Sequence, residues 1–430
     1  MPLILKLYAV AATIGAPALR LMLARRRRQG RELAARLPER WGEDASARPP
    51  GPLLWLHAAS VGETMSVLPV LAALAQANVQ VLMTTGTVTS ARLLDQRLPA
   101  LRLEGQVRHR FVPLDVPAWA ARFLDHWRPD VAGFVESEVW PNLIAACRRR
   151  AIPICLVNAR LSPRSHARWR LVPGLADALF GAFARVQAQS EDDALRLRAL
   201  GARDVTAPGN LKFAAPELSA DPGELARLRA VLGNRPVWLA ASTHPGEEAI
   251  AAAVPAALAP RHPGLLTIIV PRHPERGAGV VAELAGVELA GAAPARRGLG
   301  EDPPAGAGIW IGDTIGELGL FIRLAGPVFM GKSLAGLGGQ NPLEPARLGR
   351  PVAVGPDAGN FREPVAALRA AGALAEVADA AALTAWVDAL LADPARAAAM
   401  GQAGIAAAAR TAGLPGEVAA ALLELAYARA

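Results

Sequence analysis

The sequence predicts an α/β protein with two doubly wound parallel-sheet domains and an apolar helix at its N-terminus. The chain has 430 residues, which is more than one ordinary core holds. Short apolar runs alternate along it with helical patterns, as is typical of parallel sheets covered by helices on both faces. The alternation loosens once, where Pro, Gly and Asp become frequent, and then resumes.

The alternation also gives the expected domain boundaries. Residues 29–207 form the first domain, residues 208–235 a linker, and residues 236–412 the second domain. A last helix is expected over residues 413–430, with the first domain as its candidate packing surface. Ligands of doubly wound sheets bind beyond the carboxyl ends of the strands, so we expect the substrates in a cleft between the two domains.

Residues 1–28 are predicted to form a membrane-anchor helix. The segment LILKLYAVAATIGAPALRLMLARRRR is apolar over about 20 residues, the length of a spanning helix, but Lys6 and Arg20 interrupt it. Arg25 to Arg28 stand where a secretory signal would be cleaved, and such a basic cluster indicates the cytoplasmic side of a membrane. An amphipathic helix packed on the body of the protein is the alternative. The sequence does not decide between a spanning helix and one that lies in the interface.

Strand-like runs end in polar residues throughout both domains. The runs are LLWLHAA, VQVLMTT, RFVPLD, VAGFVE, PICLVNA and RVQAQS, followed after the linker by PVWLAAST, LLTIIVPRH, GIWIGD, GPVFMG and PVAVGP. Because parallel strands end at the same edge of a sheet, the polar residues should gather at one edge in each domain. That pattern favours an enzyme over a purely structural protein.

The composition narrows the class of ligand. The net charge is +8, but apart from Arg25 to Arg28 the basic residues are spread along the chain, and aromatic residues make up only 5%. Neither a basic stripe nor a stacking platform for nucleic acid is present, so a membrane surface or an anionic ligand better accounts for the charge. The sequence has no clustered metal-ligand spacing and no P-loop, and we predict neither a metal nor a cofactor.

Eight motifs occur in a characteristic order. They are HAASVGE, ESEVWPN, NARLSPRS, GNLKF, STHPGEE, PRHPER, GDTIGEL and GGQNPLEPA. In this order and spacing they resemble the 3-deoxy-D-manno-octulosonic acid (Kdo) transferases of lipopolysaccharide assembly, over about residues 30–370. The resemblance implies a GT-B fold with two Rossmann-like domains. It also implies inverting transfer of Kdo from CMP-Kdo to a lipid A precursor at the cytoplasmic side of the inner membrane.

The chain departs from the family pattern at two positions. Gln340 stands where the family usually has a His, and a Gln side chain cannot titrate. A proton-transfer role at that position is therefore in doubt here. Lys332 stands where the family favours a Gly, so the local loop is expected to differ.

Glu63, at the start of a predicted helix, is the candidate general base. From spacing alone it is equally well read as a helix-capping residue, because a carboxylate in the first turn stabilises the helix N-terminus. A carboxylate can also accept the proton of an attacking hydroxyl. The family resemblance implies the catalytic role.

Glu136 and Glu138 are the next candidates. In an extended segment they would face the same side and repel each other unless a cation or a proton lies between them. An oxocarbenium-like sugar is such a cation, so we expect Glu138 to stabilise it, with Glu136 as second choice. A salt bridge to Arg160 or Arg164 is the structural alternative.

Lys212 is singled out by scarcity. Lysine occurs only at positions 6, 212 and 332, whereas arginine is abundant, so a lysine is expected where a compact ammonium is needed. By resemblance Lys212 contacts either the leaving phosphate or the carboxylate of the donor.

The donor is expected on the second domain. Arg272 offers a forked contact to phosphate, and Gly-rich turns that open helices can hold phosphate with backbone N–H groups. By resemblance Glu344 contacts the ribose or the base. The candidate donor-binding residues are Pro271, Arg272, Ile315, Gly316, Glu317, Asn341, Pro342, Leu343 and Glu344. For each of the two Gly-rich turns, at residues 314–317 and 338–341, an ordinary strand-to-helix loop without a ligand is the alternative.

Two other functions remain open. One is a GT-B transferase that uses a UDP-sugar on a lipid acceptor. The other is a membrane-anchored protein that binds a sugar nucleotide without turning it over. Measuring whether CMP or UDP stabilises the protein separates the UDP-sugar transferase from a Kdo transferase. A binding protein of the second kind would bind the nucleotide but show no turnover.

Overall fold

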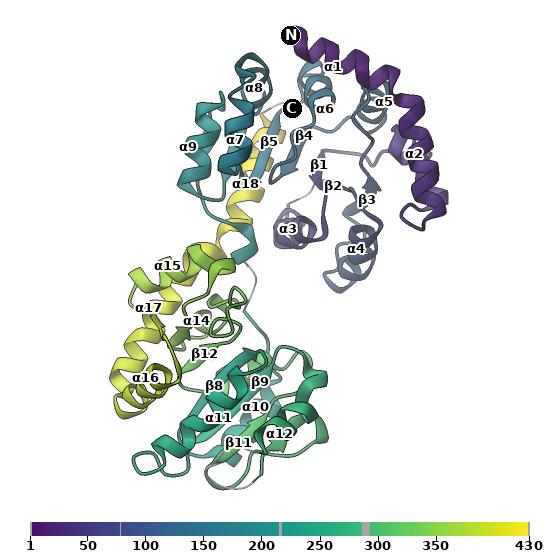
Figure 1. The fold of residues 1–430 in the computed structure, drawn as a ribbon. Helices are drawn as coiled ribbons and strands as arrows, with labels where there is room; N and C mark the ends of the chain where they lie inside the picture. Colours follow the sequence, from purple (N-terminus) through teal and green to yellow (C-terminus); the bar gives the residue numbers. More distant parts are fainter. Residues whose placement is uncertain (1, 78, 215–216, 286–292, 429–430) are drawn as a thin grey trace. The chain divides into compact units, whose positions relative to one another are not determined.

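The computed structural model describes residues 2–77, 79–214, 217–285 and 293–428. The chain divides into two compact units (Figure 1). Unit 1 comprises Met1–Ala215 and Thr411–Ala430, and unit 2 comprises Pro216–Arg410. Within the described residues each unit holds a seven-stranded parallel sheet flanked by helices, which confirms the predicted doubly wound fold class.

The sheet of unit 1 has the strand order β3-β2-β1-β4-β5-β6-β7. Its strands are β1 (Leu53–Ala58), β2 (Gln80–Thr85), β3 (Val107–Phe111), β4 (Val131–Val135), β5 (Ile154–Ala159), β6 (Arg185–Ala188) and β7 (Val205–Thr206). After β3 the chain returns to pair β4 with the other side of β1, in a register that sets Leu54 opposite Val131. The winding direction therefore reverses between β1 and β4, which is where open α/β sheets bind ligands.

Helices cover both faces of this sheet. They are α3 (Val61–Leu74), α4 (Val88–Ala100), α5 (Pro117–Trp127), α6 (Pro141–Arg149), α7 (Pro163–Trp169), α8 (Pro173–Phe180), α9 (Glu191–Ala199) and α18 (Leu414–Tyr427), with the short η1 (Ala34–Trp41) and η2 (Leu211–Phe213). Successive residues of β1 point to opposite faces, so Trp55 packs with the core of α5, α6 and α8, while Leu54 and Leu56 pack with α3 and α18. The last helix thus belongs to unit 1.

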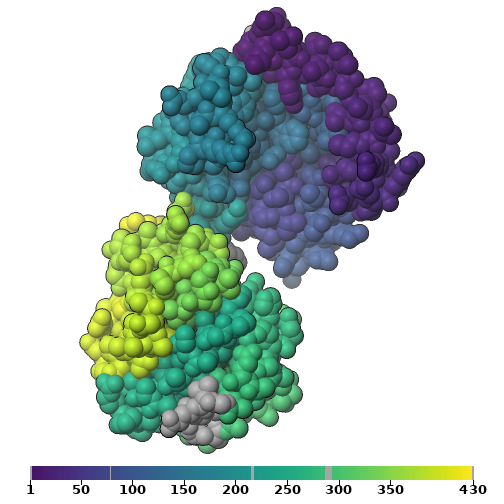
Figure 2. Space-filling model, viewed as in Figure 1, coloured from purple at the N-terminus to yellow at the C-terminus, as the bar shows by residue number. Residues whose placement is uncertain are grey.

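The apolar N-terminal segment forms two helices, α1 (Leu3–Ile14) and α2 (Ala16–Arg28), separated at Gly15. Figure 2 shows them, in purple, on the outer surface of unit 1. Leu5 is buried in the core and the Tyr8 hydroxyl donates to Asp115 Oδ2 at 3.1 Å, whereas many other apolar side chains of the pair are exposed. Among the described residues no single helix is long and apolar enough to cross a membrane. The two helices together, bent by 55°, meet that length and composition.

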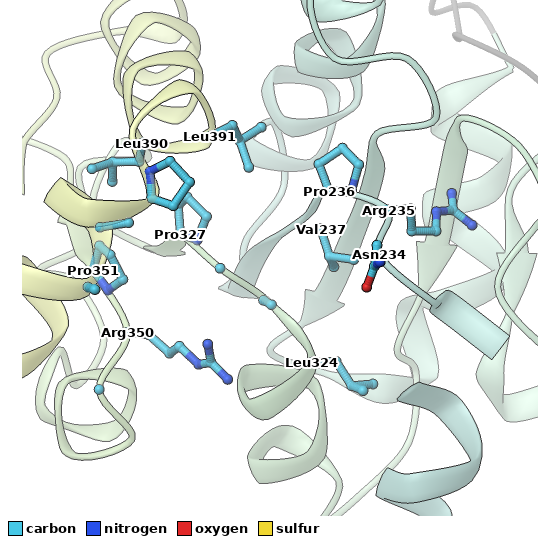
Figure 3. A pocket seen from close by; sticks show the side chains of 16 residues that line it. Asn234, Arg235, Pro236, Val237, Leu324, Pro327, Arg350, Pro351, Leu390 and Leu391 are labelled. Atoms are coloured by element: carbon cyan, nitrogen blue, oxygen red, sulfur yellow. The ribbon is translucent and has the colours of Figure 1, made fainter. Parts of the chain in front are cut away.

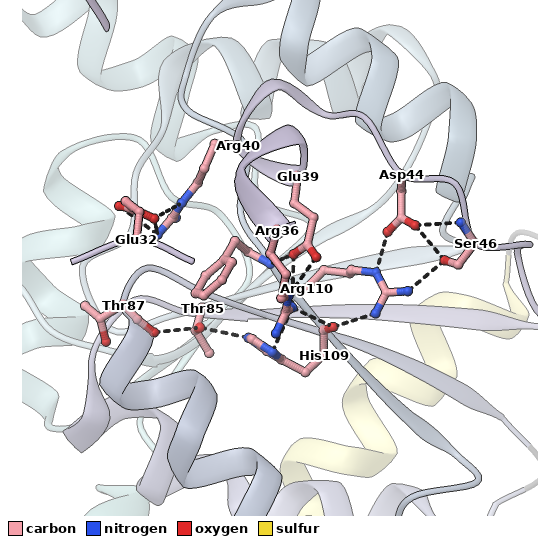
Figure 4. Close-up of polar contacts among 11 residues, drawn as sticks. Glu32, Arg36, Glu39, Arg40, Asp44, Ser46, Thr85, Thr87, His109 and Arg110 are labelled. Atoms are coloured by element: carbon pink, nitrogen blue, oxygen red, sulfur yellow. Dashed lines mark hydrogen bonds and ion pairs between the residues drawn. The ribbon is translucent and has the colours of Figure 1, made fainter. Parts of the chain in front are cut away.

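A polar network attaches the segment after α2 to the sheet (Figure 4). The buried Arg40 guanidinium binds Glu32 at 3.1 Å and donates to the Gly86 carbonyl at 2.7 Å. Arg36 contacts His109 Nδ1 at 3.1 Å, and His109 Nε2 lies 2.9 Å from Thr85 Oγ1. Since arginine only donates, Nδ1 accepts and the neutral ring donates from Nε2 to the threonine.

Unit 2 has a related doubly wound sheet with the strand order β10-β11-β9-β8-β12-β13-β14, in which the fourth strand, β11, and not the third, β10, pairs with β9. Its strands are β8 (Val237–Thr243), β9 (Leu266–Pro271), β10 (Ala295–Arg296), β11 (Gly308–Ile311), β12 (Val328–Met330), β13 (Val352–Val354) and β14 (Leu374–Glu376). Its helices are α10 (Pro222–Leu232), α11 (Glu247–Leu258), α12 (Gly277–Leu284), α13 (Leu318–Leu324), α14 (Leu343–Arg347), α15 (Arg362–Ala370), α16 (Ala380–Ala392) and α17 (Pro394–Ala412), with η3 (Pro274–Arg276), η4 (Arg297–Leu299) and η5 (Gly359–Phe361). The winding reverses between β8 and β12.

Three local expectations differ from the structure. The third strand was expected over RFVPLD but spans Val107–Phe111, because Pro113 cannot donate to a strand ladder. The two- and three-residue strands β7, β10 and β14 lie at sheet edges and are too short to leave an apolar run in the sequence. The range 208–235, expected as a linker, contains η2 and α10, and the units meet in sequence between Ala215 and Pro216.

We predict that His109 makes unit 1 less stable in acid. Burial, followed by the charges of Arg36, Arg110 and Arg40, lowers the pKa of His109 from 6.5 to about 3. Between pH 6.5 and 3 the His109 side chain is therefore protonated in the unfolded chain but neutral in the folded chain. The free energy of unfolding decreases as the pH falls through this range. The slope from this one group reaches about 1.4 kcal/mol per pH unit. Urea unfolding at several pH values should show a shallower acid loss for His109→Gln than for the native protein.

Candidate active site

The reversal of strand order in unit 1 brings three carboxylates together at one edge of the sheet. Glu63 lies in the first turn of α3, directly after β1, and Glu136 and Glu138 directly follow β4. Both other carboxylates act electrostatically on Glu63. The structure therefore assembles the carboxylates predicted from sequence, and it does so at the position where this type of sheet binds ligands.

Glu63 takes part in a reciprocal capping box at the start of α3. The Ser60 Oγ accepts from the Glu63 N–H at 3.3 Å and donates to Glu63 Oε1 at 2.9 Å, while the Ala59 N–H donates to Oε2 at 2.7 Å. Burial raises the pKa of Glu63 above its usual 4.5; the bonds from Ser60 and Ala59 lower it, and the charges of Glu138 and Glu136 raise it again. The capping function is thus present, and the carboxylate is also a stronger base than an ordinary glutamate.

Glu138 is held through one of its oxygens. Trp140 Nε1 donates to Oε2 at 2.5 Å, and His57 Nε2 lies 3.5 Å from the same oxygen. Burial raises the pKa of Glu138, but the contacts with His57 and Trp140 outweigh it and leave the pKa below the usual value. The ring of His57 is fixed on its other side by Thr84, whose hydroxyl also accepts from Trp55 Nε1 at 2.8 Å. Glu138 is therefore an ionised and oriented carboxylate.

Glu136 has a different partner from the one considered in the sequence. Its Oε1 lies 2.7 Å from Lys212 Nζ, and no ion pair with Arg160 or Arg164 occurs in the described part of the chain. The segment is a turn rather than a strand, because Glu136 has a left-handed backbone with φ of 59°. The expectation of two glutamates side by side on an extended segment is therefore wrong, and the turn sends them to separate partners.

A set of amides that the sequence analysis did not identify positions Lys212. Asn158 Oδ1 accepts from the Leu211 N–H at 2.9 Å, and Asn210 Oδ1 accepts from the Lys212 N–H at 3.0 Å. Gln189 joins the two, accepting from Asn210 and donating to the Asn158 carbonyl. Asn158 lies near the end of β5 and Gln189 directly follows β6, which was the available signal.

In unit 2 a buried carboxylate organises the corresponding edge. Glu247, at the start of α11, accepts from the N–H of His244 at 3.0 Å and from the N–H groups of Lys332, Leu334 and Ala335 at 2.6 to 3.2 Å. It therefore ties the loop after β12 to the end of β8, across the reversal point of this sheet. The sequence suggested a polar residue here but not this role.

Arg272 and Glu344, two of the residues predicted to bind the donor, lie close enough in unit 2 for the charge of Arg272 to act on Glu344. Burial raises the pKa of Glu344, and a hydrogen bond with Asn341 and the charges of Arg272 and Arg347 act against it. The Arg272 N–H donates to the Thr243 carbonyl at 3.0 Å, which holds the arginine at the end of β9 beside β8. The Arg272 side chain is exposed and available to an anion.

The other residues predicted to bind the donor differ in exposure and in their partners. Ile315 is 89% exposed, and Gly316 has φ of 85° in the turn before α13. Glu317 is already bound by Arg297 at 2.8 Å, and that bond leads the effects that lower its pKa. Pro271, Pro342 and Leu343 are buried and contribute shape rather than charge.

His244, Gln340 and Lys332 form a small cluster in unit 2. Gln340 Nε2 lies 3.4 Å from His244 Nε2, and the His244 and His273 rings pack edge to face with centroids 6.1 Å apart. Burial lowers the pKa of His244; Glu247 opposes this, and Lys332 and His273 add to it. A neutral imidazole at this edge suits hydrogen bonding to a ligand.

A separate pocket in unit 2 has a volume of about 510 Å³ (Figure 3). Its lining includes Pro236, Pro327, Arg350 and Pro351, which precede β8, β12 and β13. It therefore opens at the amino ends of the strands, away from the edge that carries Arg272 and Glu344. We do not assign the donor to it.

No group of three or more His, Cys, Asp or Glu side chains in the described residues is arranged to hold a metal ion. In unit 1 the Lys212 ammonium lies next to Glu136, and in unit 2 the charge of Arg272 acts on Glu344. The interdomain cleft expected from the sequence stays a prediction.

Comparisons with known proteins identify relatives of the chain. Residues 35–215 match the family described as 3-Deoxy-D-manno-octulosonic-acid transferase (kdotransferase). The chain is 38% identical over 408 residues to the 3-deoxy-D-manno-octulosonic acid transferase of Bordetella pertussis, covering 92% of this chain and 93% of that protein. It is 34% identical over 337 residues to the protein of the same name from Haemophilus influenzae, covering 76% of each. A crystal structure of a glycosyltransferase from Rickettsia africae shares the fold, with 13% identity and a TM-score of 0.54 over 87% of this chain and 100% of that one.

We predict that replacing Glu138 lowers the pKa of Glu63. The Glu138 charge is one of two carboxylate charges that raise the pKa of Glu63, so Glu138→Gln should move its titration to lower pH. Carbon NMR of side-chain carboxyls measures this, with the Glu63 signal identified by its loss in Glu63→Gln. Glu301→Gln in unit 2 is the control and should leave the titration unchanged. An unaltered Glu63 titration in Glu138→Gln would contradict the coupling.

Proposed function

Because the chain belongs to the 3-deoxy-D-manno-octulosonic acid transferase family, we propose that it is an inverting glycosyltransferase that moves Kdo from CMP-Kdo to a lipid A precursor in lipopolysaccharide synthesis. The observation that carries the proposal is the carboxylate group at the reversal point of unit 1. Two of its members have partners, Glu136 with Lys212 and Glu138 with Trp140 and His57, while Glu63 is bound only as a helix cap and has a raised pKa.

Glu63 acts as the general base in this proposal. It accepts the proton of the acceptor hydroxyl as the oxygen forms a bond to the anomeric carbon of Kdo. The bond from that carbon to the phosphate oxygen breaks, and CMP leaves with the electron pair. A raised pKa makes the carboxylate a better acceptor of a weakly acidic hydroxyl proton, although it must still be ionised at the working pH.

Glu138 and Lys212 stabilise charge. The sugar becomes oxocarbenium-like as the bond to phosphate weakens, and an ionised Glu138 offers the opposite charge. Lys212, whose side chain is 42% exposed, neutralises Glu136 and extends a cation towards the phosphate or the carboxylate of the donor.

Unit 2 supplies the donor contacts. Arg272 binds the phosphate of CMP with its forked guanidinium, and the half-buried Glu344, whose raised pKa reflects its burial, accepts hydrogen bonds from the ribose or the base. The turn with Ile315 and Gly316 presents backbone N–H groups to the phosphate of the donor. The transfer requires no metal, because side-chain cations neutralise the leaving group.

The N-terminal helices associate with the cytoplasmic side of the inner membrane. Exposed apolar side chains on α1 and α2 include Leu3, Leu7, Ile14 and Leu21, and the basic run Arg25 to Arg28 ends α2. Apolar side chains enter the lipid interface and arginines attract anionic head groups, which supports a surface that brings the enzyme to its lipid acceptor.

We predict that Glu63→Gln abolishes transfer without unfolding the protein. Glutamine can keep the capping hydrogen bonds but cannot take the proton, so kcat should fall by about 100- to 10,000-fold. The free energy of unfolding should change by no more than about 1 kcal/mol. Mass spectrometry of the lipid product measures transfer and also counts the Kdo units added.

The matched control is the capping box of α9. There Ser190 Oγ accepts from the Asp193 N–H at 3.2 Å and donates to Asp193 Oδ2 at 2.7 Å, the same pattern as in α3. Asp193→Asn should retain activity. If Glu63→Gln also retains it, Glu63 is only a helix cap and the mechanism is wrong.

We predict that CMP, and not UDP, raises the melting temperature. A ligand that binds only the folded state stabilises it by about 2.7 kcal/mol at 100 times its Kd. Arg272→Ala should reduce the shift with CMP, and EDTA should change neither the shift nor the transfer rate. A larger shift with UDP would favour a UDP-sugar transferase instead. A shift with CMP but no transfer to any lipid acceptor would favour a binding protein.

A further inference from the structure

His57 is a fully buried histidine that the mechanism has not used. It ends β1, with 0% of its surface exposed, and its ring packs edge to face against Phe134 and Trp140 at 6.0 and 6.3 Å. Both of its nitrogens face polar atoms of the site, Thr84 on one side and Glu138 on the other. An ionisable side chain in such a position needs a hydrogen-bonding reason.

The contacts of Nδ1 determine where one proton lies. Nδ1 is 3.1 Å from the Thr84 carbonyl oxygen and 3.0 Å from Thr84 Oγ1. A carbonyl oxygen can only accept, so the contact with the Thr84 carbonyl is favourable only when Nδ1 carries a hydrogen. The Thr84 hydroxyl, which accepts from Trp55 Nε1 at 2.8 Å, has a second lone pair that can accept from Nδ1 as well. Nδ1 therefore carries a hydrogen and donates to Thr84.

The same tautomer leaves Nε2 facing a carboxylate. Glu138 Oε2 is 3.5 Å away, and within the described part of the chain the buried Nε2 has no other hydrogen-bond partner. A bare Nε2 would set a lone pair against a carboxylate oxygen in a place closed to water. A proton on Nε2 turns this into an attractive charge-assisted contact.

The proton belongs on the imidazole rather than on Glu138. The Trp140 Nε1 group can only donate, and it donates to Glu138 Oε2 at 2.5 Å, a bond that favours the ionised carboxylate. Two N–H groups, from Trp140 and His57, then hold Oε2. In the described residues no hydrogen bond reaches Oε1, and the side chain keeps 19% exposure, so this oxygen can face the substrate.

We propose that His57 is a positioning residue whose imidazolium form fixes Glu138 through Nε2–H, so that Glu138 presents its free oxygen, as an anion, to the reacting sugar. This rests on the proposed role of Glu138 in transfer. The pair has no net charge in the resting enzyme, which also limits the repulsion between Glu138 and the nearby Glu63 and Glu136. Glu136 is balanced in turn by Lys212.

Nitrogen NMR of protein labelled with ¹⁵N-histidine tests the proposal directly. The chain has seven histidines, and the His57 signals are identified by their loss in His57→Gln. At pH 7 both ring nitrogens of His57 should be protonated in the native enzyme. In Glu138→Gln the ring should become neutral, with one bare nitrogen, because its counter-charge is gone.

His109 is the built-in control for the measurement. It lies two strands from His57, is also buried, and receives an arginine donor on Nδ1. Its nitrogen signals should therefore show a neutral ring in the native enzyme, in His57→Gln and in Glu138→Gln. A bare nitrogen on His57 in the native enzyme, or a protonation state that does not respond to Glu138→Gln, would overturn the proposal. Both readouts are independent of whether Kdo is transferred.

Kinetics then separate positioning from a merely structural role. His57→Gln should lower kcat on the order of 100-fold, the size of one lost preorganised contact, with KM for CMP-Kdo little changed. Combined with Glu138→Gln it should cause no further loss, since both changes remove the same interaction. Additive losses in the double variant would contradict the proposal. Absence of transfer by the native enzyme would instead reject the proposed function and leave the NMR result standing.

Discussion

The repulsion between carboxylates at one sheet edge is the constraint around which unit 1 is arranged. The reversal between β1 and β4 places the start of α3 beside the turn after β4, so Glu63, Glu136 and Glu138 cannot avoid each other. Like charges this close raise each other's pKa unless cations intervene. The structure supplies Lys212 to Glu136 and the N–H groups of Trp140 and His57 to Glu138. Glu63 receives only the capping hydrogen bonds from Ser60 and Ala59.

That asymmetry gives chemically identical side chains different properties. Glu138 is more acidic than an ordinary glutamate although it is largely buried, because its donors outweigh the cost of burial. Glu63 is less acidic, because capping hydrogen bonds from Ser60 and Ala59 only partly offset burial and neighbouring charge. The capping and catalytic readings of Glu63 are therefore compatible. The cap orients the carboxylate, and its surroundings set its basicity.

Unit 2 has a related doubly wound sheet with different charged residues at its strand ends. Its reversal between β8 and β12 is braced by the buried carboxylate of Glu247, which is saturated by backbone N–H groups and has no role as a base. Arg272 stays exposed beside it, which suits an anionic donor. Two doubly wound sheets thus offer a carboxylate of raised pKa in one unit and an exposed arginine in the other.

The sequence by itself determined the doubly wound fold, most of the long strands and the identity of the carboxylates, because apolar periodicity and strand-end polarity are local features. The family resemblance added the reaction. The tertiary structure decided which residues are partners. The turn at Glu136 sends it to Lys212, more than seventy residues away in sequence, and not to Arg160 or Arg164. It also divided the apolar N-terminus at Gly15, and it placed His57 against Glu138. Such pairings depend on strand order and on backbone conformation at single residues, and neither is encoded in spacing along the chain.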